Sequence, residues 1–138
     1  MDPRRRLAAN VASESEAYGY TLAVWGSGAL LIDAFGIPGV RQAMGFVGGA
    51  LLGFGTLAVL AVGGISEQVS PSDSPSTLVV STVHIVATGG TLLGVDRLIE
   101  VVPGERVLVG FVAVGVFVTV TYNLLLLVEE LAVELVTE

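Results

Sequence analysis

The chain lacks cysteine and lysine altogether, and each absence removes a class of chemistry. Without cysteine there are no disulfides, no thiolate metal sites and no cysteine nucleophile. All six basic residues are arginine, against 13 acidic residues, for a net charge of −7. Nucleic acid is a poor partner for this balance, because its affinity for proteins rests on phosphate neutralisation. The acidic, lysine-free composition suits a protein that stays hydrated at high salt, although a biased genome explains it equally well.

Charge of either sign is also scarce. Only 14% of the 138 residues are charged and 53% are hydrophobic, whereas a soluble domain is about one quarter charged. Four apolar runs dominate the chain, at about 17–35, 42–65, 77–99 and 106–128. As helices, runs of this length match about 30 Å of hydrocarbon, and they lack the alternation of barrel strands. The sequence therefore predicts an all-α membrane protein with four transmembrane helices.

Three polar segments flank or divide these runs. We expect a polar N-terminal arm at 1–16, a polar linker at 66–76 and an acidic C-terminal helix extension at 129–138. The linker contains two prolines and cannot cross lipid with unsatisfied backbone groups. In the extension, Glu129, Glu130 and Glu134 are interpreted as a solvated helix face. A secretory signal peptide is not expected, because polar and acidic residues follow the N-terminal arginines.

One ten-residue pattern occurs twice. Residues 38–47 and 103–112 share P-G-x-R-x-x-x-G-F-V, displaced by 65 positions. Each copy follows one apolar run and opens the next, which is typical of a hairpin turn with proline at a helix start. The pattern predicts two tandem helical-hairpin repeats, 17–65 and 77–128, with antiparallel neighbouring helices in each. Because each repeat crosses the membrane twice, a pseudo-two-fold axis along the membrane normal relates the copies.

Glycines spaced by four residues predict close helix packing. The second run carries a ridge of Gly45, Gly49 and Gly53, and the third run carries Gly90 and Gly94. Helices gain no hydrophobic energy by associating in lipid, so close backbone contact matters more there. The partner of the ridge is either another helix of the chain or a second subunit.

Charged residues gather at the two turns and define a candidate charged face: Asp33, Arg41, Asp96, Arg97 and Arg106. Charges near the hydrocarbon boundary seek partners, so we expect Asp33 and Asp96 to pair with Arg41 and Arg106, within a hairpin or between hairpins. Three arginines lie on this side and three at the N-terminus. The positive-inside rule is therefore tied, and we expect a multi-pass cell-membrane protein with both termini cytoplasmic, since an arginine triplet resists translocation.

A candidate polar cluster surrounds the only histidine, His84. Ser81 and Thr88 share its helix face, and Tyr122 and Asn123 fall at similar depth on the fourth run. An ionisable group inside a membrane is a functional suspect, and histidine could relay protons. A histidine bonded to Tyr122 or Asn123 would instead be a structural interhelical contact, and this interpretation is favoured.

No catalytic pattern is present. The chain has no metal-ligand set, phosphate loop, nucleophile elbow or paired carboxylate within the runs, so neither an enzyme nor a cofactor is expected. We expect a non-enzymatic packing or accessory membrane protein, whose partners are the lipid bilayer and a second copy or another membrane protein. The alternative is a small channel or transporter formed by an oligomer, with the polar stripe around His84 lining it.

Overall fold

The computed structural model describes residues 3–64 and 77–137. They form helices α1 (Pro3–Phe35), α2 (Val40–Gly64), α3 (Thr77–Val101) and α4 (Val107–Thr137), with a short 3-10 helix η1 (Gly104–Arg106) before α4. Side chains are described at Pro3 and Arg6, and within 17–61 and 84–136. No strand occurs in the described part of the chain, so the all-helical prediction with four helices is confirmed.

Helix α1 begins much earlier than the first apolar run. Residues 3–16, expected as a polar arm, form its first turns. Proline suits the first helical position because its missing N–H has no intrahelical partner there. The residues that follow are mostly alanine, arginine, leucine and glutamate, with no glycine or proline before Gly19, and such residues favour a helix. The segment expected as a polar arm is therefore helical from residue 3 onward.

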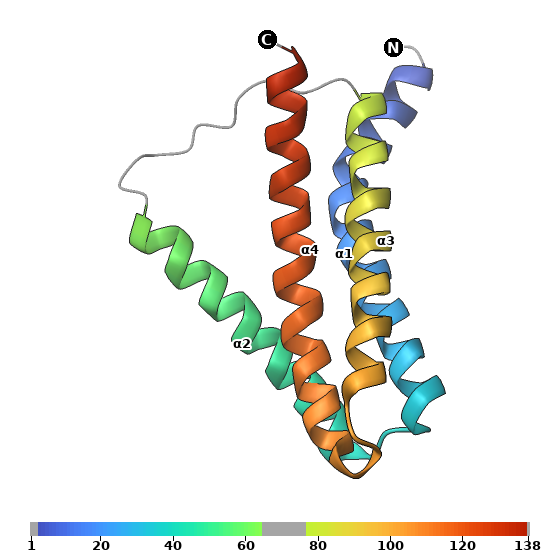
Figure 1. Cartoon of the computed structure of the whole chain (residues 1–138). Coiled ribbons are helices and arrows are strands. Elements are labelled where there is room, and N and C mark those ends of the chain that lie inside the picture. The colour runs from blue at the N-terminus through green and yellow to red at the C-terminus, as the bar shows by residue number, and fades with distance from the viewer. Residues whose placement is uncertain (1–2, 65–76, 138) are drawn as a thin grey trace.

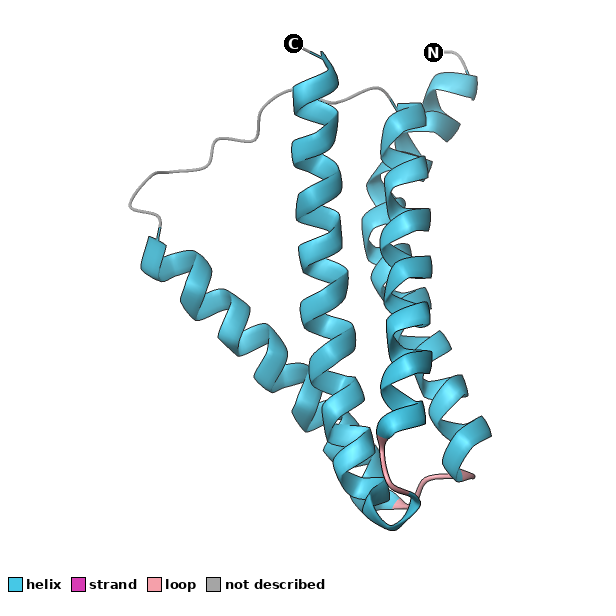
Figure 2. Ribbon diagram, in the orientation of Figure 1, coloured by secondary structure: helices cyan, strands magenta, loops and turns pink. Residues whose placement is uncertain are grey.

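The repeated pattern lies at the two turns (Figure 2). Gly36 ends α1 in the left-handed conformation, φ 81°, and its N–H donates to the Ile32 carbonyl at 2.8 Å. Glycine is favoured there because it has no Cβ to clash. In the second turn the Arg106 N–H donates to the Pro103 carbonyl at 2.8 Å and closes η1. In both copies a helix starts within the P-G-x-R segment or directly after it.

The helices pack as an α1–α3–α4 group with α2 leaning against α4 (Figure 1). Helices α1 and α2 make almost no contact, so the expected packing within the first hairpin is wrong. The physical reason is that the glycine ridge of α2 packs on the α4 backbone instead. The second half of α2 then diverges from the group towards the upper left of Figure 1.

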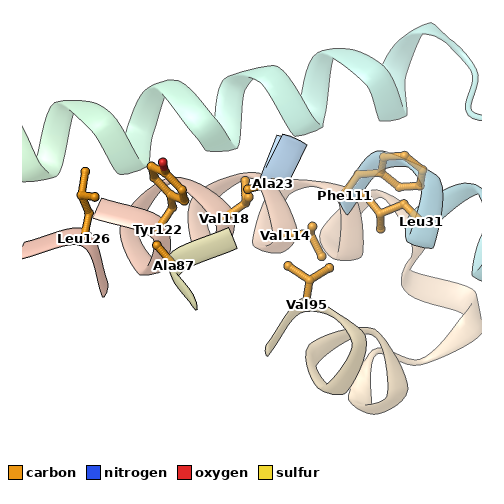
Figure 3. Packing of buried hydrophobic residues seen from close by; sticks show 9 residues of the cluster. All are labelled: Ala23, Leu31, Ala87, Val95, Phe111, Val114, Val118, Tyr122 and Leu126. Atoms are coloured by element: carbon orange, nitrogen blue, oxygen red, sulfur yellow. The ribbon is translucent and has the colours of Figure 1, made fainter. Parts of the chain in front are cut away.

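The core lies between α1, α3 and α4, and none of its nine buried hydrophobic residues comes from α2 (Figure 3). Helix α4 contributes five of them, and α1 and α3 contribute two each. The nine residues are Ala23, Leu31, Ala87, Val95, Phe111, Val114, Val118, Tyr122 and Leu126.

Two helical segments are long and apolar enough to cross a membrane within the described residues: Val40–Ala61, and Gly104–Val136, which includes η1. Only 11% of the first span is buried inside the molecule, against 39% of the second. Length and composition thus weakly indicate membrane association for these two, rather than for four. Helix α1 is more polar because tyrosines, glycines and Ser27 interrupt its apolar run.

Candidate functional site

Three helices meet at Gly19, where α1 has no side chain. A methyl group at this position would overlap the Tyr122 hydroxyl of α4 and lie 3.3 Å from the His84 Cβ of α3. The Thr88 hydroxyl of α3 donates to the Gly19 carbonyl at 3.2 Å. The absent side chain thus allows polar groups of α3 and α4 to reach the α1 backbone. His84, Thr88 and Tyr122, which the sequence grouped together, all lie around this glycine.

A second polar contact joins α1 to α4 beside it. The Tyr20 hydroxyl lies 3.0 Å from Thr119 Oγ1, and the Thr119 hydroxyl lies within donating distance of the Gly115 carbonyl, at 3.2 Å. With Thr119 donating to Gly115, Tyr20 must be the donor to Thr119. The Tyr20 and Tyr122 rings are tilted, with centroids 5.6 Å apart, a favourable aromatic geometry. Both phenols therefore belong to one polar layer.

His84 is 92% buried in this layer, with a relative exposure of 8%. Within the described structure neither ring nitrogen has a hydrogen-bond partner. The sequence left two alternatives, a hydrogen-bonded structural histidine and one that relays protons or lines a pore formed by an oligomer. The ring is buried and, within the described residues, is not bonded to Tyr122 or Asn123, so the structural contact expected from the sequence is not formed. An unpartnered buried nitrogen has a substantial desolvation cost.

The remaining predicted members of the cluster lie elsewhere. The Asn123 amide donates to the Thr119 carbonyl of its own helix at 2.7 Å, and the residue is exposed. Ser81 lies on α3, but its side chain is outside the described residues. Sequence reasoning missed Gly19 and Thr119 as members. The spacing of Gly115, Thr119 and Tyr122, four and then three residues, was the available signal, since it places them on one face of α4.

Glu129 corrects the interpretation of the C-terminal extension as a solvated face. Both of its carboxyl oxygens are buried and, within the described residues, have no hydrogen-bond partner. Glu130 and Glu134 are exposed, as expected. Glu129 lies one and two turns beyond Leu126 and Tyr122, on the face of α4 that packs against the core. Because the segment is acidic, its sequence gave no indication that Glu129 faces inward.

At the charged face, one ion pair is present in the described part of the chain. Arg97 Nη1 lies 3.1 Å from Glu100 Oε2, and both side chains are largely exposed, so the pair adds little stability. None of the pairs expected between Asp33 or Asp96 and Arg41 or Arg106 is formed there. All four of these residues are exposed. The face therefore gathers charges without an ion-pair network.

All five packing glycines contact α4. The ridge on α2 follows α4 in parallel: Gly45 meets Leu108, Gly49 meets the Val112 backbone and Gly53 meets the Val116 carbonyl. Gly115 of α4 approaches the Phe46 carbonyl of α2 in return. On α3, Gly90 meets Leu125 and Gly94 meets Phe117, in the antiparallel sense. The ridge on α2 is therefore occupied within the chain.

Comparison with protein-family models, curated proteins and solved structures finds no match. Among the described residues, no group of three or more His, Asp or Glu side chains could hold a metal ion. The arrangement instead offers buried hydroxyls, one imidazole and one carboxyl group. All of these groups can form hydrogen bonds with water, and the imidazole and the carboxylate can each also take up a proton.

Proposed function

We propose that the chain is an integral membrane protein in which all four helices cross the bilayer. The glycine contacts run in the same direction along α2 and α4, so these two helices are parallel. If both cross the membrane, the chain must return between them, and α3 is the one helix described between them that could make that crossing. Helix α1 packs along α3 and ends at the turn from which α2 starts. This arrangement supports a multi-pass protein with both termini on one side. The N-terminal arginine triplet favours the cytoplasm as that side.

The exposed surface of α2 supports a lipid environment. Leu51, Leu52, Phe54, Val59 and Leu60 are each at least 63% exposed. A contiguous apolar surface of this kind is a liability in water but ordinary in lipid. Trp25 of α1 is 76% exposed, as for a side chain facing lipid.

The contacts between helices also support the duplication. Gly49 meets Val112, 63 positions later, and Gly19 meets His84, 65 positions later. The sequence repeat has nearly the same displacement, so equivalent helices of the two hairpins pack through equivalent levels. We propose a pseudo-two-fold relation that is broken by the divergence of α2.

For function, we propose a non-enzymatic accessory membrane protein that works by associating with a second copy of itself through α2. The observation that carries this proposal is the open face of α2. Gly48 and Gly55 have no atom within 4 Å of an added methyl group and are two turns apart on one face. On its other face the same helix packs in parallel on α4 through glycines. A parallel two-fold dimer would pack two α2 helices through glycines in the same way, and each residue at the interface would contact the same residue of the second copy.

Single-cysteine cross-linking in liposomes tests the association. Gly55→Cys is expected to give disulfide-linked dimers. The control Leu22→Cys lies on α1 about as far from its turn, is also exposed, and is expected to stay monomeric. Absence of dimers from Gly55→Cys, or equal dimers from both variants, would contradict the proposal.

The second candidate is a small channel or transporter formed by an oligomer. The observation that favours it is His84, whose ring is buried and has no hydrogen-bond partner among the described residues. His84→Ala should then reduce proton or ion flux in liposomes severalfold. Ile85→Ala, at the exposed neighbouring position, should leave the flux unchanged. Equal flux in all three proteins excludes this role.

A further inference from the structure

We propose that His84 and Glu129 together form a buried proton-binding site between α3 and α4, joined by one bridging water. The first observation is that these two residues supply all four buried polar side-chain atoms that have no partner in the described structure. One is a base and the other an acid. Each therefore offers what the other lacks.

The helix register places the two groups at the same level. Helix α3 runs antiparallel to α4, with Gly94 against Phe117 and Gly90 against Leu125. Continuing this register sets residue 84 opposite about residue 129, and the Glu129 carboxyl lies by the backbone of Ala87, one turn after His84. Both residues face inward, since His84 is buried and Glu129 follows Leu126 on the core face of α4. The two side chains do not form a direct hydrogen bond, so the bridge is a water molecule.

Charge neutrality explains why such a pair tolerates lipid. With one shared proton, the pair is either a neutral imidazole with a protonated carboxyl group or an imidazolium with a carboxylate. Both forms contain the same atoms and have zero net charge. In the transfer the carboxyl O–H bond and one water O–H bond break, while a new water O–H bond and the imidazole N–H bond form, so the water is regenerated. A lone buried charge would be far more costly. The two groups therefore bind the proton as a unit.

No other charged side chain among the described residues lies close enough to pair with His84 in place of Glu129. Among the side chains that the structure describes, the other titratable groups on the packed faces are the phenols Tyr20 of α1 and Tyr122 of α4. The glycine contacts of α2 on α4 lie at Leu108, Val112, Val116 and Thr119, all before Glu129 along the helix. Glu130 is exposed. Among the described groups, Glu129 is thus the acid within reach of His84. The site needs neither a dimer nor transport activity, so it stands or fails independently of the proposed functions.

Nitrogen NMR of the bilayer-reconstituted protein tests the site, because the single histidine gives an unambiguous pair of ring ¹⁵N signals. Glu129→Gln removes the acid, and the His84 ring signals are expected to shift well beyond their linewidth. Glu130→Gln is the matched control, at the exposed neighbouring position, and should leave them in place. Ring signals that respond equally weakly to both substitutions overturn the proposal.

Thermal stability gives a second readout if Glu129→Gln fails to fold. His84→Leu and Glu129→Leu each leave one orphaned partner, so each is expected to lower the Tm. The double variant removes both polar groups and should lower the Tm by less than the sum of the two single effects. Additive losses would show that the two residues act independently and would overturn the site.

Discussion

At the scale of single residues, the polar layer depends on a glycine flanked by aromatic hydroxyls. Gly19 lets Tyr122 and His84 approach the α1 backbone, and its carbonyl accepts the Thr88 hydroxyl. Tyr20, the next residue, reaches Thr119. Adjacent residues of α1 therefore bind α3 and α4 respectively. This layer, rather than the apolar core alone, fixes how α1 is rotated about its axis.

Gly19→Ala is expected to destabilise the bundle. The added methyl group would collide with the Tyr122 hydroxyl and the His84 Cβ, and overpacking of this kind costs about 1–3 kcal/mol. Gly28→Ala is the matched control on the same helix, because nothing lies within 4 Å of its added methyl group. It should be neutral or slightly stabilising through helix propensity. Unfolding in mixed micelles measures both, and equal effects would contradict the packing described for Gly19.

Tyr20→Phe is expected to cost about 0.5–1 kcal/mol of unfolding free energy, because it removes one hydrogen bond between helices. Thr119 keeps the Gly115 carbonyl as acceptor, so no buried hydroxyl is orphaned and the loss stays modest. Tyr18→Phe, at a position 62% exposed, should have no measurable effect. The same unfolding assay compares the two, and a larger loss at Tyr18 would reverse the assignment.

At the scale of helices, turn chemistry was readable from sequence and packing partners were not. The repeated proline pattern predicted where the first helix ends and the next begins, because a proline at a helix start acts locally. The left-handed glycine that ends α1, Gly36, is also a local effect. The start of α1 at Pro3 was missed because a polar composition was taken to mark an arm, although none of its residues breaks a helix. Glu129 was also misplaced because a polar composition was interpreted as a solvated segment. Its inward direction depends on the packing of α4 against α3, which the sequence alone does not give. The partner of the α2 ridge depends equally on tertiary structure.

The ridge on α2 gives a sharp test of that partner. Gly49→Ala would push a methyl group into the Val112 backbone, whereas Gly48→Ala, one position earlier, meets nothing. We expect Gly49→Ala to detach α2 from α4 at a cost of about 1–3 kcal/mol, and Gly48→Ala to leave α2 in place. Distances between spin labels on α2 and α4 should lengthen only in Gly49→Ala. Unchanged distances in both variants would show that the ridge does not hold the helix.

At the scale of the whole molecule, composition predicted the helical class and the number of helices, and the repeat predicted where the turns lie. Neither composition nor the repeat predicted that α1 and α2 separate. A hairpin turn reverses the chain direction but does not determine which helix faces pack together. Pairing of Asp33 and Asp96 with arginines also failed at this scale, since exposed charges at a hydrated turn need no protein partner. Because α1 and α2 separate, the two hairpins are not packed alike: α4 contacts three helices, whereas α2 packs against α4 alone. The open side of α2 is the surface on which the proposed association rests.

Single-cysteine labelling in sealed vesicles tests the central claim, four crossings with both turns on one side, most directly. The chain has no native cysteine, so each position reports alone. Gly39→Cys and Gly104→Cys at the turns should react with a membrane-impermeant reagent from one side only. Arg6→Cys and Val136→Cys near the termini should react only from the other. If either turn labels from the same side as the termini, then α1 or α3 does not cross the bilayer and the four-helix membrane account is wrong.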